Sequence, residues 1–234
     1  MISVIKNGPM NAFRMSLSSL LITEYQFLGT FKTMQRAKIQ LSEEETALVL
    51  NPGWILTKRS IMDKAGMLLG ELAAGYQALT RNSKAMSPEL SGRFPKLTRG
   101  ENYQGLPYMI LDYPAVFDKT DVFAVRTFFW WGNYFSLTLH LKGRYQKQYL
   151  PAVIEGIQQS SHGDWQVSIS EDEWAHSVLQ GDYARGKDLA PGVGQDLESR
   201  PFLKVAAIIP LERWDDIPTL LSDRFLEILG WLEG

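Results

Sequence analysis

The sequence predicts an α+β fold, in which helices pack against an antiparallel sheet with a central β-hairpin, and three observations support this prediction. Two β-rich runs, 122–131 and 134–141, are separated only by Gly132 and Asn133, which is the signal of a tight hairpin. Segments with helical spacing of apolar residues lie before and after these runs. Helices and strands do not alternate regularly, so we do not expect a parallel, doubly wound sheet.

Composition and charge narrow the class of protein. Hydrophobic residues make up 45% and charged residues 21% of the 234 positions, which is ordinary globular usage and suffices for one full core. The formal net charge is −2 and no basic block is present, so we expect no nucleic-acid partner. The sequence has no Cys, which excludes disulfides, thiolate metal sites and a Cys nucleophile. We expect no cofactor.

The N-terminal stretch fits the rest of the chain poorly. Its apolar run Ser16–Ile22 is short, and Glu24 and Tyr25 stand where a signal peptide would have small residues for cleavage. No stretch approaches the ~20 apolar residues that span a bilayer, so we expect no membrane partner and a cytoplasmic location. We predict a loosely ordered extension over 1–33 and a single α+β domain over 34–234.

Two helices are predicted first, and together they are expected to form a helical hairpin. Ser42 and Glu45 have the spacing of a capping box, in which each side chain accepts a hydrogen bond from the other residue's backbone. This helix ends at the Asn-Pro-Gly breaker of 51–53. A longer helix over 57–79 follows, with apolar residues at helical spacing.

Residues 81–105 are predicted to be a long polar connection that leads into a strand over 106–113. Connections of this length are uncommon inside compact domains and are often functional. Asn102, Tyr103 and Gln104 lie at its end, and polar loop residues held by a sheet often form binding sites. We therefore include these three residues among the ligand-binding candidates.

The hairpin itself gives the main prediction about a site. A two-residue turn at 132–133 places Trp131 opposite Tyr134, and side chains then alternate between the two faces. One face is nearly all apolar apart from Arg126. The other face mixes rings with polar side chains, and its ligand-binding candidates are Phe129, Trp131, Tyr134, Thr138 and His140.

The C-terminal half is predicted to contain three helices and two strands. The strand over 202–209 is a near-continuous apolar run, which indicates a central position in the sheet. Acidic residues open a short helix at 170, where the helix dipole favours them. The predicted elements are a helix over 142–159, a strand over 165–169, a helix over 170–178, a loop over 182–200, the strand over 202–209 and a helix over 217–232.

His140 and Arg126 are the weak candidates for catalysis, together with Asp112. His140 is either a general base or ligand-binding group, or a structural histidine beneath a covering element. The rings of its face form either a stacking platform or part of the core. Arg126 needs a partner on the apolar face, because a lone buried guanidinium is costly, and Asp112 on the preceding strand is expected to pair with it. Anion binding by Arg126 is the alternative.

The remaining motifs do not predict a metal site, a phosphate-binding loop or a serine nucleophile. Glu173 and His176 have the i, i+3 spacing of carboxylate-bridged metal sites, but such sites need the motif twice, so we expect no metal. The glycines of 185–194 lack the ending of a phosphate-binding loop. No Ser lies in a nucleophile elbow.

Three hypotheses about function follow. The leading one is a non-catalytic binding or protein-interaction module that uses the mixed face and the loop 99–105, with an unknown small molecule or protein as partner. The alternative is an enzyme that acts on a small polar or anionic substrate, with His140 as general base and Arg126 or Arg99 holding charge. The third is a structural subunit of a homo-oligomer that associates through its aromatic face.

Overall fold

The structure is a computed structural model that describes residues 39–84, 86–178, 181–189 and 193–233. The chain separates into two compact units, Met1–Lys58 and Arg59–Gly234. The expected extension over 1–33 lies outside the described residues. The expected start of the domain at residue 34 therefore stays a prediction.

Helix α2 (Glu43–Leu50) begins at the predicted capping box. The Oγ of Ser42 accepts the N–H of Glu45 at 3.1 Å, and Oε2 of Glu45 accepts the N–H of Ser42 at 2.7 Å. Helix α3 (Pro52–Asn82) follows after Asn51 and is longer than predicted. Every residue of α2 is exposed, so the expected helical hairpin has no packed seam on this helix.

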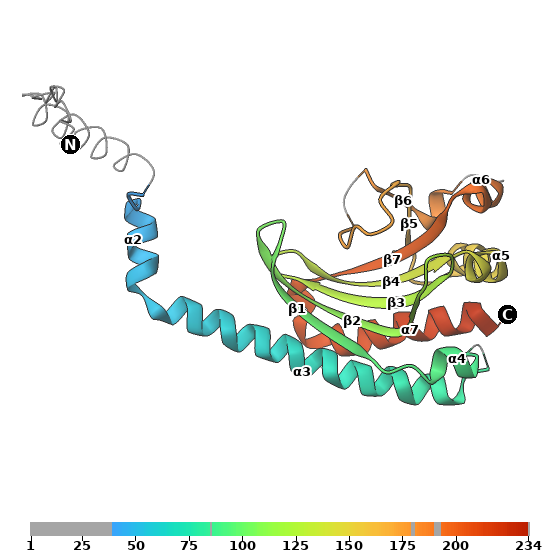
Figure 1. Cartoon of the computed structure of the whole chain (residues 1–234), viewed down its shortest axis with the longest axis horizontal. Helices are drawn as coiled ribbons and strands as arrows, with labels where there is room; N and C mark the ends of the chain where they lie inside the picture. Colours follow the sequence, from blue (N-terminus) through green and yellow to red (C-terminus); the bar gives the residue numbers. More distant parts are fainter. Residues whose placement is uncertain (1–38, 85, 179–180, 190–192, 234) are drawn as a thin grey trace, which may run out of the picture. The chain divides into compact units, whose positions relative to one another are not determined.

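The second unit contains a sheet of seven strands, all paired in antiparallel fashion, which confirms the predicted α+β class (Figure 1). In spatial order the strands are β1 (Lys96–Tyr103), β2 (Leu106–Phe117), β3 (Val122–Trp130), β4 (Tyr134–Lys142), β7 (Phe202–Pro210), β5 (Gln166–Ser168) and β6 (Tyr183–Arg185).

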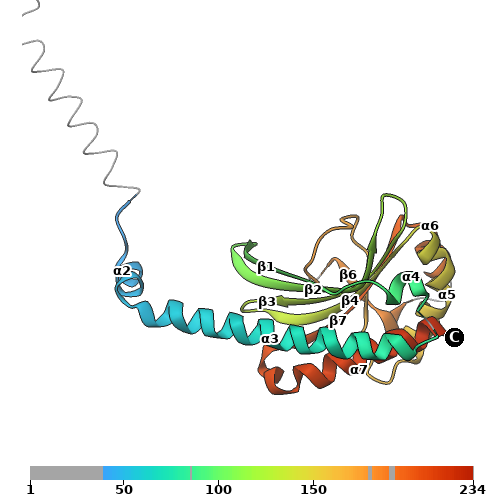
Figure 2. The ribbon, with the colours of Figure 1, turned by 60° about the horizontal axis from the view of Figure 1, so that its bottom comes forward.

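Helices cover one face of this sheet, which we call the covered face (Figures 1 and 2). α7 (Ile217–Glu233) and the part of α3 after Arg59 lie side by side there, and the ring of Tyr76 stacks on Phe225 with centroids 3.9 Å apart. α5 (Arg144–Gln159) joins the same core. The shorter helices are α4 (Pro88–Ser91), η1 (Gly186–Asp188), α6 (Val193–Ser199) and η2 (Leu211–Asp216).

The register of the β3–β4 hairpin differs by one residue from the prediction. Trp130, not Trp131, pairs with Tyr134, and the turn has three residues with Gly132 at a φ of 70°. A slip of one residue exchanges the faces of all side chains on one strand relative to the other. The observed register groups apolar residues of both strands on the covered face and moves Arg126 beside Thr138, so burial outweighs the turn preference.

Three segments differ from the predicted secondary structure. The polar connection 81–105 contains α4 and β1, and β1 turns into β2 through Gln104 and Gly105, with φ values of 50° and 84°. Two successive residues with positive φ are typical of a tight hairpin turn. The described part of 182–200 contains β6, η1 and α6, and 170–178 is irregular where a helix was predicted.

Candidate functional site

The other face of the sheet, which we call the open face, is divided between charges and rings. Paired residues of neighbouring strands direct their side chains to the same face. Asp112, Arg126 and Thr138 are paired across β2, β3 and β4 and form one row of side chains on this face. In the next row, His140 of β4 pairs with Lys204 of β7. Toward the β1–β2 turn lies a cluster of rings, which comprises Tyr103, Tyr108, Phe128, Trp130 and Tyr134.

An irregular segment over 170–178, which we call the strap, covers part of the open face. Its backbone turns because Oδ1 of Asp172 accepts the N–H groups of Trp174 at 2.9 Å and of Ala175 at 3.1 Å. A short side chain that satisfies nearby backbone donors in this way competes with helix formation. The acidic residues that suggested a helix start therefore form a turn instead.

Two tyrosine hydroxyls hold the second half of the strap. The hydroxyl of Tyr103 accepts the N–H groups of His176 and Ser177, each at 3.0 Å. The hydroxyl of Tyr134 accepts the N–H of Val178 at 2.6 Å. These two ligand-binding candidates thus anchor the backbone of the strap to the ring cluster.

Two lysines hold the first half of the strap. The Nζ of Lys204 donates to the carbonyl oxygens of Ala175 at 2.6 Å and of Glu173 at 3.3 Å. The Nζ of Lys142 lies 2.7 Å from Oε2 of Glu173. Lys204 is buried, and these carbonyls and the carboxylate compensate part of the cost of removing its charge from water.

Arg126 joins the strap to the sheet. Its Nε and Nη2 donate to the two carboxylate oxygens of Asp112 at 2.7 and 2.9 Å, which confirms the predicted pair. Its Nη1 lies 2.9 Å from Nδ1 of His176. Because a guanidinium only donates, Nδ1 of His176 accepts, and a neutral His176 carries its proton on Nε2.

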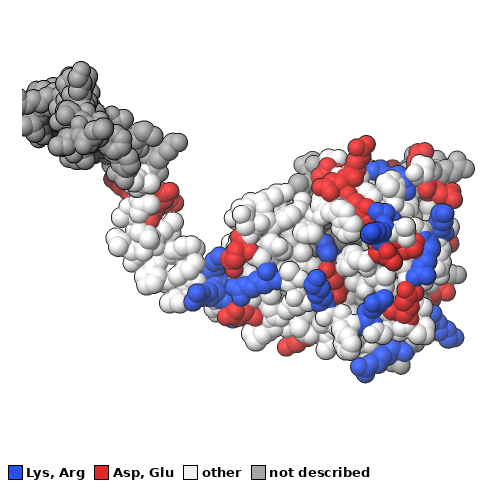
Figure 3. Space-filling model, in the orientation of Figure 1, with Lys and Arg blue, Asp and Glu red and all other residues white. Residues whose placement is uncertain are grey.

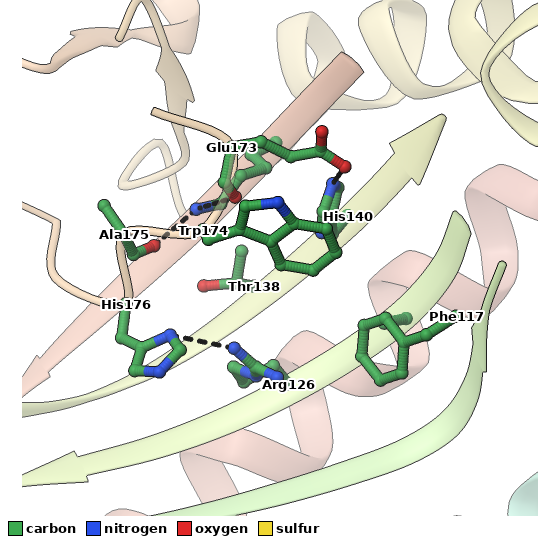
Figure 4. A pocket seen from close by; sticks show the side chains of 10 residues that line it. Phe117, Arg126, Thr138, His140, Glu173, Trp174, Ala175 and His176 are labelled. Atoms are coloured by element: carbon green, nitrogen blue, oxygen red, sulfur yellow. Dashed lines mark hydrogen bonds and ion pairs between the residues drawn. The ribbon is translucent and has the colours of Figure 1, made fainter. Parts of the chain in front are cut away.

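A small cavity of about 10 Å³, room for about one water molecule, lies between the strap and the sheet (Figure 4). Nε2 of His140 and Oε1 of Glu173 approach to 3.3 Å there, but neither atom has a hydrogen bond within the described part of the chain. Both atoms are buried. The cavity is lined by Phe117, Ala124, Arg126, Thr138, His140, Glu173, Trp174, Ala175, His176 and Lys204.

Burial and neighbouring cations lower the pKa values of three groups around the cavity. Burial, followed by Lys204, Arg126 and Lys142, lowers the pKa of His140 to about 3. Burial and the charges of Arg126 and Lys204 lower the pKa of His176 to about 4. Burial and Arg126 lower the pKa of Lys204 to about 8. The carboxylate of Glu173 favours a protonated His140, but burial and three cations outweigh it, so both histidines are neutral at pH 7.

Two larger hollows flank this site. The first, which we call the groove, has a volume of about 470 Å³ and is lined by Gly92, Arg93, Phe94, Lys96, Asp112, Ala115 and Phe117. The second, of about 370 Å³, lies between the β1–β2 turn and the strap and includes the candidates Tyr103 and Gln104. Asn102 instead closes the turn, because its Oδ1 accepts the N–H of Gly105 at 3.0 Å.

Two predicted ring candidates lie away from the open face. Phe129 is 1% exposed in the core of the covered face, against the rings of Phe135 and Trp214. Trp131 lies in the turn and packs against the same core. Of the two alternatives for these rings, the structure places Phe129 and Trp131 in the core.

Sequence reasoning missed Lys204, although a single cation within the apolar run 202–209 is a usable signal.

Comparisons with protein-family models, with curated protein sequences and with solved structures found no match for this chain. No helix among the described residues is both long enough and apolar enough to cross a membrane. The described residues also contain no group of three or more His, Asp or Glu side chains placed to hold a metal ion. On the side seen in Figure 3, basic and acidic side chains are interspersed over the second unit.

Proposed function

We propose that this chain is a non-catalytic binding module, and that a small polar or anionic molecule binds on the open face beneath the strap. The observation that carries the proposal is the pair of buried polar atoms, Nε2 of His140 and Oε1 of Glu173, that line the cavity without hydrogen bonds. A buried polar group left without a partner costs about 1–3 kcal/mol. A ligand with a donor and an acceptor would recover this cost.

The charges around the cavity favour an anion. Arg126, Lys142 and Lys204 contribute three positive charges, and Asp112 and Glu173 contribute two negative charges. Because both histidines are neutral, these five groups have an excess of one positive charge at pH 7, which the carboxylate of Asp172, acting on Lys204 and His176, balances while the strap is closed. A carboxylate or phosphate oxygen would accept from the same donors that now hold the strap.

The size of the cavity requires the strap to move for any ligand larger than a water molecule. The strap is suited to such movement because side-chain hydrogen bonds, rather than strand pairing, hold most of it to the sheet. Trp174, its largest residue, is 52% exposed and contributes little to the core. Ligand oxygens that replace the strap carbonyls on Lys204 would offset the bonds lost on opening.

The pKa of His140 argues against the catalytic alternative. General-base catalysis is most efficient when the pKa of the base lies near the working pH, and a base whose pKa is about 3 is weak at pH 7. The ammonium group of Lys204 is occupied by two carbonyl oxygens. The oligomer hypothesis used the face with Phe129 and Tyr134, and the burial of Phe129 and the hydrogen bond between Tyr134 and the strap count against it.

Thermal shift against acetate, citrate, inorganic phosphate and AMP tests the proposal. A ligand that binds only the native state raises the melting temperature in proportion to the logarithm of its concentration above Kd. We expect at least one of these probes to stabilise the native chain, and we expect His140→Gln and Lys204→Met to remove the effect. Arg185→Gln, which changes an exposed cation on β6, is the matched control. Absence of any shift, or an equal shift in all variants, would contradict the proposal.

A further inference from the structure

The edge strand β1 pairs with only part of β2. β1 pairs with β2 from Tyr103 opposite Leu106 to Lys96 opposite Asp112. β2 continues to Phe117, and after an irregular stretch at 113–114, where both residues are buried, it pairs with β3 over 115–117. Among the described residues, 115–117 therefore has a strand on one side only. An exposed strand edge is a template for pairing with another chain.

The groove lies beside this unpaired edge. Ala115 and Phe117 of β2 form one side of the groove, and the chain that leads into β1 forms the other side with Arg93 and Phe94. The side chain of Phe94 is 89% exposed and that of Phe117 is 46% exposed. Two rings this exposed offer an apolar surface to a binding partner.

The charge of the groove is positive. Arg93 and Lys96 are exposed, and neither has an ion pair within the described part of the chain. The carboxylate of Asp112 also lines the groove, but Arg126 neutralises it. The groove thus presents two unpaired cations next to two aromatic rings, and an acidic partner complements it.

We propose that the groove binds a short, extended acidic segment of a partner protein, which adds a strand to β2 along 115–117. The added strand continues the line of β1, its carboxylates contact Arg93 and Lys96, and an apolar side chain packs on Phe94 and Phe117. Peptides bind exposed sheet edges in this way, with affinity from the backbone and specificity from alternate side chains. The groove shares Phe117 with the cavity beneath the strap, and its other lining residues differ from those of the cavity.

A peptide fits the groove better than a small molecule does. Pockets for small molecules bury about 70–90% of the ligand surface, and a groove whose rims include a nearly fully exposed ring cannot enclose a ligand to that degree. A strand of three residues spans roughly 10 Å at about 3.3 Å per residue, so a short peptide reaches along the whole of 115–117.

Fluorescence polarisation of the full chain with a fluorescein-labelled peptide, Glu-Val-Glu-Phe-Glu-Val, tests the charge requirement. We expect saturable binding that weakens as salt rises, and no binding of the same peptide with Lys at each Glu position. The double variant Arg93→Glu/Lys96→Glu should bind at least about tenfold more weakly, because two attractions become repulsions. Arg185→Glu/Lys187→Glu, an equal change of charge near the opposite sheet edge, should alter binding less than about twofold.

The strand geometry has its own test. Methylating alternate backbone nitrogens of the peptide removes donors without changing its charge, and we expect one of the two methylation patterns to abolish binding, because alternate residues pair on each side of a strand. Binding should also slow amide hydrogen exchange within 115–117. Phe94→Ser changes an exposed ring, so it should fold normally and bind more weakly, whereas His140→Gln should bind as the native chain does. Absence of saturable binding, equal loss in the control double variant, or equal binding of both methylated peptides would overturn the proposal.

Discussion

Replacing His140 by Gln should reduce the loss of unfolding free energy that this protein shows as the pH becomes acidic. The native ring is buried beside Lys204, Arg126 and Lys142, and its pKa is lowered from 6.5 to about 3. In the unfolded chain the ring is exposed and recovers an ordinary pKa. Between these two values the unfolded state therefore binds a proton that the folded state refuses, and the free energy of unfolding falls as the pH falls.

The magnitude follows from the gap between the two pKa values. Each pH unit below 6.5 costs about 1.4 kcal/mol until the folded ring itself protonates. At pH 5, roughly 1.5 units lower, His140 alone accounts for about 2 kcal/mol. This contribution to stability is fully present above pH 6.5 and is lost toward pH 3. His176, whose pKa is lowered to about 4, adds a slope of the same sign, so His140→Gln flattens the pH dependence without abolishing it.

Urea unfolding between pH 7.5 and pH 4.5 measures this difference. Gln keeps a donor near the position of Nε2 and does not titrate, so the slopes of stability against pH are compared rather than the absolute stabilities. His162→Gln, which changes a histidine that contacts Glu227 outside the cavity, is the control. Equal slopes in the native chain and in His140→Gln would refute the assignment of a neutral, buried His140.

Three further predictions concern the anchors of the site and the core. Asp112→Asn should destabilise the chain by about 2–4 kcal/mol in urea unfolding, because it leaves the partly buried Arg126 without its carboxylate, whereas a loss below about 1 kcal/mol would mean that water screens the guanidinium. Tyr103→Phe should speed amide exchange at His176 and Ser177 by about tenfold, since it removes their shared acceptor, and unchanged exchange would show that the strap is held elsewhere. Phe225→Ala should cost about 3–5 kcal/mol, because its ring stacks in the core, and a smaller loss would indicate that the core collapses around the cavity.

Local chemistry made much of the fold predictable. The capping box of Ser42 and Glu45 begins a helix as expected, because both residues lie within one turn of each other. The apolar run 202–209 forms a central strand, since only a strand buried on both sides tolerates so many apolar residues. The pairing of Arg126 with Asp112 followed from the cost of a lone buried charge.

The register of the hairpin was not predictable from the turn alone. Gly132 and Asn133 favour a two-residue turn, but that turn would place Arg126 among the leucines of β4 beneath the helices. The three-residue turn directs Leu137 and Leu139 to the covered face and leaves Arg126 on the open face. Burying a charge among leucines costs more than a less favoured turn does, so packing across the whole sheet decided the register.

The strap was not predictable because its anchors are distant in the sequence. Lys204 lies about thirty positions after the carbonyls that it holds, and the hydroxyl of Tyr103 lies more than seventy positions before its donors. Within 170–178 the local pattern favours a helix start, whereas the fold uses Asp172 to turn the backbone. Only the tertiary arrangement shows that this segment lies across the charged rows of the sheet.

The strap occupies the place that a ligand would otherwise take. Its carbonyl oxygens accept from the buried Lys204, and the imidazole of His176 accepts from the partly buried Arg126, so the backbone and one side chain supply acceptors to these cations. A ligand with oxygen acceptors can exchange for these groups at a small net cost, because each donor keeps a partner throughout. His140 gains a hydrogen-bond acceptor in the exchange, since its Nε2 lies 3.3 Å from Oε1 of Glu173 but has no hydrogen bond while the strap is closed. The difference between the two states therefore favours a ligand that reaches both Lys204 and His140, which is why variants at these two positions provide the decisive binding test.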